Sequence, residues 1–122
     1  MKKLVGGILL LDAFAFSNAQ TITFDKTTID YGTVKANSDG NRVFTFTNTG
    51  DKPLILSNVQ PGCGCTASEY TKEPILPGKK GEIKVHYNTA TVAPFKKTID
   101  VFSNDPANGR IVLYIQGTVV AQ

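Results

Sequence analysis

The sequence predicts an all-β domain, an immunoglobulin-like β-sandwich of about seven or eight antiparallel strands. Apolar and polar residues alternate with a period of two, as in half-buried strands, and no stretch has the 3.6-residue period of a helix. Clusters of turn-forming residues separate these stretches at intervals of about 8–12 residues, as in all-β sandwiches. The length that remains after a predicted leader is removed, about 100 residues, suits an immunoglobulin-like sandwich.

The predicted strands lie between clusters rich in Gly, Asn, Asp and Pro, at residues 37–41, 48–53, 61–62, 77–78 and 104–109. In chain order the strands cover about residues 21–24, 29–34, 42–48, 54–60, 65–70, 81–88, 95–102 and 110–119. Alternation is clearest in the third, sixth and eighth, whose core faces carry Phe44 and Phe46, then Ile83, Val85 and Tyr87, then Ile111, Leu113 and Ile115. The chain has no Trp and its two cysteines are close together, which excludes an antibody-type domain.

Residues 1–19 have the pattern of a cleaved secretory signal peptide. A positive start at Lys2 and Lys3 precedes a short apolar run, and Ala19 is the small residue expected before the cleavage site, although Asp12 is unusual there. The apolar run is much shorter than the roughly 20 residues of a membrane-spanning helix, and no later segment is more apolar. We therefore predict an exported protein, periplasmic or secreted, with one domain at residues 20–122 and no membrane segment in the mature chain.

The net charge of the mature chain does not favour a nucleic-acid partner. Removal of residues 1–19 leaves 103 residues and lowers the net charge from +3 to +2. The basic doublets Lys79-Lys80 and Lys96-Lys97 are predicted to be solvated lysines in turns and on strand edges. They do not form the concentrated basic stripe with interleaved aromatic residues that nucleic-acid-binding proteins normally have.

Both cysteines of the chain lie in Cys63-Gly64-Cys65. A disulfide between them would close a three-residue loop and stabilise the fold by only about 1.6 kcal/mol of loop entropy. In an extended strand the two Cα atoms would be about 6.6 Å apart, near the upper limit for a disulfide. Four interpretations stay open: a structural or inert Cys63–Cys65 disulfide, buried unpaired thiols, a strained redox-active disulfide, and a Cu(I) site made by Cys63 and Cys65.

Nothing else in the sequence indicates a catalytic or metal site. A structural zinc ion would need two further ligands, and His86 is the only histidine. Its position in the alternating pattern places His86 on the polar face of a strand, where an exposed histidine is the simpler interpretation. No Ser-His-Asp arrangement and no phosphate-binding loop can be recognised, so we do not predict an enzyme.

Several segments resemble a known bacterial family. They are Asp30-Tyr31-Gly32-Thr33-Val34, residues 44–54, Gly62-Cys63-Gly64-Cys65-Thr66, Pro77-Gly78-Lys79, Phe95-Lys96-Lys97 and Ser103-Asn104. Over about residues 22–119 the chain is similar to the family known as domain of unknown function 1573. Ala93 stands where that family usually has Gly. The resemblance implies an exported protein of the kind typical of Bacteroidetes, with a sandwich similar to ASPM, SPD-2 and Hydin domains, and it implies no activity.

These observations together predict a small binding or structural module of the cell envelope. The module would present loops or a sheet edge to an envelope protein partner, by a mode such as β-strand addition. The alternative is a copper-binding or redox protein that uses the thiols of Cys63 and Cys65.

Overall fold

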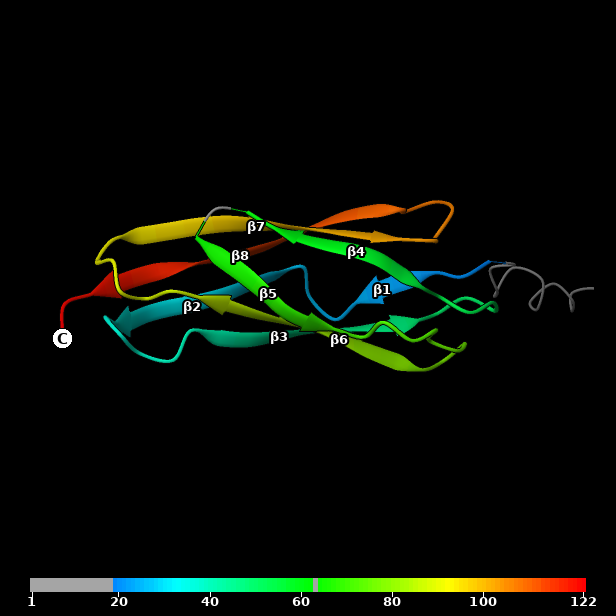
Figure 1. The fold of residues 1–122 in the computed structure, drawn as a ribbon, viewed down its shortest axis with the longest axis horizontal. Helices are drawn as coiled ribbons and strands as arrows, with labels where there is room; N and C mark the ends of the chain where they lie inside the picture. Colours follow the sequence, from blue (N-terminus) through cyan, green and yellow to red (C-terminus); the bar gives the residue numbers. More distant parts are fainter. Residues whose placement is uncertain (1–18, 63) are drawn as a thin grey trace, which may run out of the picture.

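The computed structural model describes residues 19–62 and 64–122, and these form a β-sandwich of eight strands (Figure 1). The strands are β1 (Ile22–Phe24), β2 (Thr28–Lys35), β3 (Asn41–Asn48), β4 (Leu56–Pro61), β5 (Cys65–Tyr70), β6 (Lys80–Tyr87), β7 (Pro94–Ser103) and β8 (Arg110–Val120). No helix occurs among the described residues, so the predicted fold class is confirmed. The predicted strand bounds agree within one residue at every end except the start of β4. Apart from Ala19, the predicted signal peptide lies outside the described residues.

The strands form two four-stranded sheets, in the orders β1-β3-β6-β5 and β2-β8-β7-β4. The chain crosses from the first sheet to the second between β1 and β2, and β2 runs parallel to its neighbour β8, the one exception among the named strands to the predicted antiparallel pairing. Every other pair of named strands is antiparallel, as predicted. The edge strands are therefore β1 and β2 on one side of the sandwich and β4 and β5 on the other.

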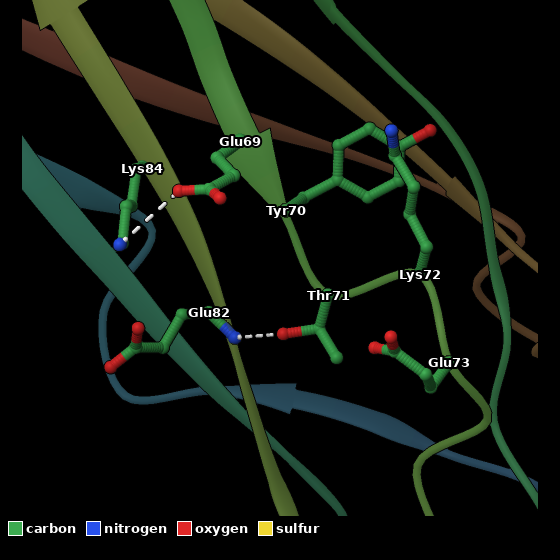
Figure 2. A pocket seen from close by; sticks show the side chains of 7 residues that line it. All are labelled: Glu69, Tyr70, Thr71, Lys72, Glu73, Glu82 and Lys84. Carbon is green, nitrogen blue, oxygen red and sulfur yellow. Dashed lines mark hydrogen bonds and ion pairs between the residues drawn. The ribbon is translucent and has the colours of Figure 1, made fainter.

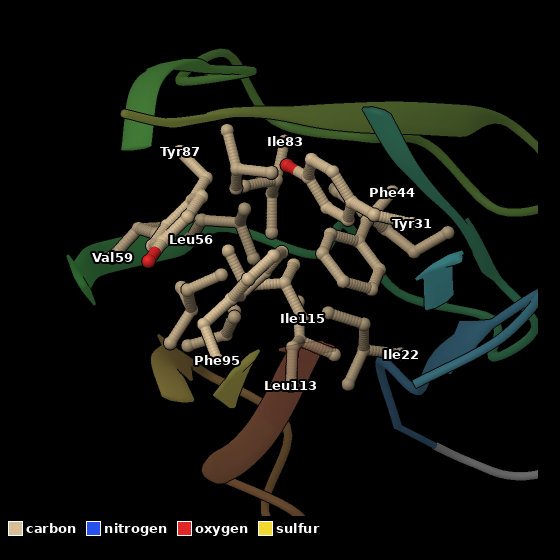
Figure 3. Close-up of a cluster of buried hydrophobic side chains, with 14 of the residues drawn as sticks. Ile22, Tyr31, Phe44, Leu56, Val59, Ile83, Tyr87, Phe95, Leu113 and Ile115 are labelled. Atoms are coloured by element: carbon tan, nitrogen blue, oxygen red, sulfur yellow. The ribbon is translucent and has the colours of Figure 1, made fainter. Parts of the chain in front are cut away.

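The core lies between the sheets and is built from the alternating residues (Figure 3). Phe44, Phe46, Ile83, Leu113 and Ile115 have no exposed surface, whereas the polar residues between them face solvent. Burying apolar side chains of this size is the main stabilising term of such a fold. Gly81 sits beneath one of these rings, since a Cβ there would lie 2.4 Å from Cζ of Phe46.

Asn48 is a buried polar residue at the end of β3, and its side-chain amide uses all of its hydrogen-bonding capacity. Its Oδ1 accepts hydrogen bonds from the backbone amides of Thr21 (3.2 Å) and Gly50 (3.0 Å). Its Nδ2 donates to the backbone carbonyls of Lys52 (2.7 Å) and Ile75 (2.8 Å). One side chain thus joins the segment before β1, the turn after β3 and the loop before β6.

The start of β4 differs from the prediction, because Leu54 does not pair with β7. Leu54 and Ile75 instead exchange two backbone hydrogen bonds of 2.9 and 2.8 Å in an isolated bridge across one end of the sandwich. The side chain of Asn104 then accepts a hydrogen bond from the amide of Ile55 (2.9 Å), while the Asn104 amide donates to the Ile55 carbonyl. Regular pairing with β7 begins only at Leu56.

Asp105 is a buried carboxylate in the turn between β7 and β8. Its Oδ2 accepts a hydrogen bond from the amide of Ile22 (3.0 Å), and its Oδ1 accepts from those of Ala107 (2.8 Å) and Asn108 (3.0 Å). Burial raises the pKa of Asp105, but the three backbone donors lower it by more, so the pKa lies below its ordinary value of 3.8. The ionised carboxylate therefore fastens β1 to this turn.

The Asp105→Asn variant is expected to be less stable than the wild type by about 2 kcal/mol at pH 7, the usual contribution of hydrogen bonds to a charged group. Because the pKa of Asp105 is lower in the folded protein, this stabilisation is present above pH 3.8 and is lost as the pH falls through the folded pKa. Urea unfolding at pH 7 and at acid pH measures the difference, which should narrow in acid. The exposed Asp51→Asn variant serves as control. A difference that stays constant with pH would contradict this role for the charge.

Candidate functional site

Gly62 and Gly64 lie in the turn between β4 and β5, where the chain passes from one sheet to the other, and Cys65 follows as the first residue of β5. The amide of Gly62 donates to the carbonyl of Thr98 on β7 (2.7 Å), and the amide of Cys65 donates to the Gly62 carbonyl (3.4 Å). Gly64 has a φ of 87°, a conformation that favours glycine. Cys63 lies outside the described residues, so the predicted Cys63–Cys65 disulfide and the predicted thiol site stay predictions.

Cys65 begins β5 opposite Tyr87 of β6 and is partly buried. Its Sγ lies 3.4 Å from the Gly62 carbonyl and 3.9 Å from that of Thr98. Within the described part of the chain, no group of three or more His, Cys, Asp or Glu side chains is placed to hold a metal ion.

Lys97 brings a positive charge to the same turn, a feature that the sequence interpretation missed. We expected the Lys96-Lys97 doublet in a turn or on an edge strand, but both residues lie in β7, an interior strand of its sheet. Lys97 is in phase with the buried residues Phe95 and Ile99 and is itself partly buried. A Cβ on Gly64 would lie 3.1 Å from its Cε and 3.5 Å from its Nζ. The sequence did contain a sign of this feature, because Lys97 stands at a position of the alternating pattern where the neighbouring residues, Phe95 and Ile99, belong to the core.

Three aromatic rings pack across the two sheets next to this turn. The ring of Tyr87 stacks on that of Phe95 with centroids 3.8 Å apart, and the ring of Tyr31 meets Phe95 edge-on at 5.3 Å. The three rings belong to β6, β7 and β2, so the cluster joins strands of both sheets. This packing holds Tyr87, the cross-strand neighbour of Cys65, in place.

Tyr31 of this cluster also contacts Arg42 on β3. Burial raises its pKa to about 12, with smaller contributions from Arg42, which lowers it, and from Cys65 and Asp39, which raise it. The guanidinium of Arg42 lies 4.0 Å from the ring centroid, and the hydroxyl donates to the carbonyl of Gly40 (2.7 Å). The phenol is therefore held in the fold as a hydrogen-bond donor.

β5 itself is an edge strand, hydrogen-bonded to β6 on one side and to no described strand on the other. Just beyond β5, the amide of Thr71 donates to the carbonyl of Glu82 on β6 (3.1 Å). Successive amides of an extended chain point to opposite sides. The backbone amide and carbonyl of Tyr70 therefore face the open edge, where a further strand could pair.

A hollow of about 390 Å³ lies beside the end of β5 (Figure 2). It is lined by Glu69, Tyr70, Thr71, Lys72, Glu73, Glu82 and Lys84. Figure 2 shows Thr71 in the middle, with Glu82 and Glu73 on opposite sides and the ion pair of Glu69 and Lys84 (3.2 Å) beyond. Thr71 also accepts a hydrogen bond at Oγ1 from the amide of Glu82 (3.1 Å), which fixes the floor of the hollow.

The charges of the hollow are only partly balanced. Lys84 pairs with Glu69, and the ammonium of Lys72 lies 5.3 Å from the ring centroid of Tyr70. Neither Glu73 nor Glu82 forms an ion pair with any residue that the structure describes. The sequence interpretation did not single out this site, because its residues come from two strands and a loop, and their proximity depends on the β5–β6 register.

His86 lies on the outer face of β6, as its phase predicts. The ring is exposed, and its Nδ1 lies 3.1 Å from Oδ1 of Asn41 on the neighbouring strand β3. The described residues form no helix that is long and apolar enough to cross a membrane.

Comparisons with known proteins place this fold among known sandwiches. A crystal structure of a protein of unknown function from Porphyromonas gingivalis W83 superposes with a TM-score of 0.72 and 17% identity, over 88% of this chain and 51% of that one. The PapD-like domain 7 of human CEP192 gives a TM-score of 0.66 at 9% identity, over 93% and 94% of the two chains. The YadV chaperone gives 0.51 at 18% identity, over 83% of this chain and 52% of that one. These likenesses concern the fold.

The chain spans about half the length of the P. gingivalis protein. A comparison with curated proteins finds no match. The family model for proteins of unknown function named DUF1573 matches residues 22–119, which is nearly the whole described chain and confirms the resemblance found in the sequence. The chain therefore belongs to the DUF1573 family.

Proposed function

We propose that this protein is a non-catalytic binding module of the bacterial cell envelope, and that it takes up an extended segment of a partner protein along the open edge of β5. The observation that carries the proposal is the edge itself, where the backbone groups of Tyr70 face outward beside a hollow of about 390 Å³. Strand addition to such an edge supplies main-chain hydrogen bonds, and an adjoining pocket supplies selectivity.

The other sheet edges support this role less well. β1 has only three residues, and β4 ends in Pro61, which has no amide hydrogen to donate. The pairing of β2 with β8 is interrupted at Tyr31 and Gly32, where the register shifts. β5 also has a bulge, between Ala67 and Glu69, but the hollow begins just after it.

Two further features support the location and the class of partner. The signal pattern of residues 1–19 supports export to the envelope. One solved structure with a similar fold is that of a chaperone, a class of protein that acts on other proteins, which supports a protein as the ligand.

Site-specific photo-crosslinking in living bacteria tests the proposal. A photoreactive amino acid replaces Thr66, an exposed residue of β5, and in a control protein it replaces Thr28, an exposed residue of the edge strand β2. We expect the Thr66 protein to give one discrete adduct whose crosslinks map to a single segment of one envelope protein. Absence of an adduct from Thr66, or the same adduct from both positions, would contradict binding along β5.

Thiol chemistry at the cysteine turn is a second candidate function, favoured by the position of Lys97. A positive charge near a cysteine favours the reactive thiolate, and Lys97 lies beside Gly64, the residue that separates the two cysteines in the sequence. The Lys97 side chain extends over Gly64 from an inner-face position, where lysine is otherwise unexpected. Intact mass with and without alkylation tests this function, because a mature protein with no alkylatable thiol even after mild reduction would remove its support.

A further inference from the structure

We propose that the partner segment carries a lysine or arginine that lies against Glu69, Glu73 and Glu82, and that apolar residues alternate with it along the segment. This inference rests on the proposed binding along β5 and adds the chemistry of the partner. It follows from the charges on the outer face of β5 and β6 and from the burial of the inner face.

The first argument is the cross-strand ion pair next to the open edge. Glu69 and Lys84 are register partners on β5 and β6, and their charged atoms are 3.2 Å apart. Side chains directly opposite one another on neighbouring strands interact, and opposite charges are favoured there. A strand added on the free side of β5 would place one of its side chains on the other flank of Glu69. A cation at that position continues the alternation of charge across the sheet, whereas an anion would be repelled.

The second argument is the unbalanced charge of the hollow. The Lys72 ammonium is held near the ring of Tyr70, and Lys84 is held by Glu69. The carboxylates of Glu73 and Glu82 have no ion-pair partner among the described residues. They flank the floor at Thr71, and about 390 Å³ gives room for a long side chain (Figure 2). The site therefore has net negative charge and space where a basic side chain of an added strand would enter.

The third argument concerns the other face of the added strand. Tyr70 and Ala67 of β5 are partly buried and pack against the core. Side chains of an added strand that point the same way would extend this apolar layer, because neighbouring residues of a strand point to opposite faces. The predicted segment therefore has apolar residues on one face and at least one basic residue on the other.

Titration of the isotopically labelled protein with three synthetic peptides tests the inference by NMR. The peptides share one extended, alternating sequence and differ only at the central outer-face position, which is lysine, glutamine or glutamate. We expect the lysine peptide to change the chemical shifts of residues along β5 and of residues 71–73. The glutamine peptide should bind about fivefold more weakly, since its side chain cannot form ion pairs with the exposed carboxylates. The glutamate peptide should bind most weakly, and high salt should reduce the differences.

Charge-swapped protein supplies the matched control. The Glu73→Lys/Glu82→Lys double variant should prefer the glutamate peptide, whereas Asp25→Lys, an exposed acidic residue between β1 and β2, should keep the preference for lysine. Equal binding of all three peptides along β5 would contradict the proposed basic residue of the partner, but it would still support strand addition at this edge. Shifts away from β5, or none with any peptide, would overturn both.

Discussion

Replacing Asn48 with alanine is expected to destabilise the protein by about 3–4 kcal/mol. The substitution removes two acceptor and two donor interactions of a side chain that has no exposed surface. The amide of Gly50 and the carbonyl of Lys52 then lose the hydrogen bonds that Asn48 supplies, and the carbonyl of Ile75 keeps only the one from the amide of Leu54. Polar groups that lose a partner inside the fold are costly. Urea unfolding measures the loss as a lower midpoint with an unchanged dependence on urea.

Two further variants separate this explanation from a general effect of substitution. Asn48→Asp keeps the size of the side chain but turns a second oxygen toward the carbonyls of Lys52 and Ile75, so it should be about as damaging as alanine. Asn88→Ala removes an exposed asparagine with one local hydrogen bond to Ala90, and it should change stability by less than about 0.5 kcal/mol. An Asn48→Asp protein as stable as the wild type would show that the donated hydrogen bonds do not matter.

Replacing Phe95 with alanine is expected to cost about 3–5 kcal/mol, as for other buried phenylalanines. Phe95 is 7% exposed, stacks on Tyr87 and meets Tyr31 edge-on, so its loss leaves a cavity where three strands of both sheets meet. Phe102→Ala is the matched control, because Phe102 lies on the same strand but is partly exposed and should cost clearly less. Urea unfolding compares the two variants. Equal losses would contradict the role assigned to the aromatic cluster.

Much of the fold could be predicted because alternation alone decides which residues face the core. Phe44 and Phe46, or Ile83 and Val85, are buried in the structure as their phase requires. The start of β4 could not be predicted, because Leu54 looks like a strand residue and only its bridge to Ile75 excludes it from the ladder with β7. The parallel pairing of β2 with β8 likewise depends on how the sheets pack.

The candidate site could be predicted only in part. The cysteine turn stands out in the sequence as a local motif, and the structure places Gly64 and Cys65 at the junction of β4 and β5. The hollow beside the end of β5 depends on the β5–β6 register that brings Glu69 next to Lys84. A one-residue bulge in β5 sets that register. Such a bulge leaves no clear trace in composition or periodicity.

The structure also shows what several polar residues near the turns do. Asn48, Asn104 and Asp105 all bind backbone groups of other segments at one end of the sandwich. Their side chains organise the loops and strand ends rather than a site for a ligand.

Hydrogen exchange of the Tyr70 amide tests binding along β5 most directly. In the protein alone this amide points to the open edge, so its exchange should be much faster than that of the paired amide of Thr71. In the complex trapped by crosslinking from position 66, we expect exchange of the Tyr70 amide to slow markedly, because the added strand accepts its hydrogen bond. Exchange of the β1 amides should not change. Unchanged exchange of the Tyr70 amide in that complex, or slower exchange only in β1 or β2, would contradict binding of the partner along β5.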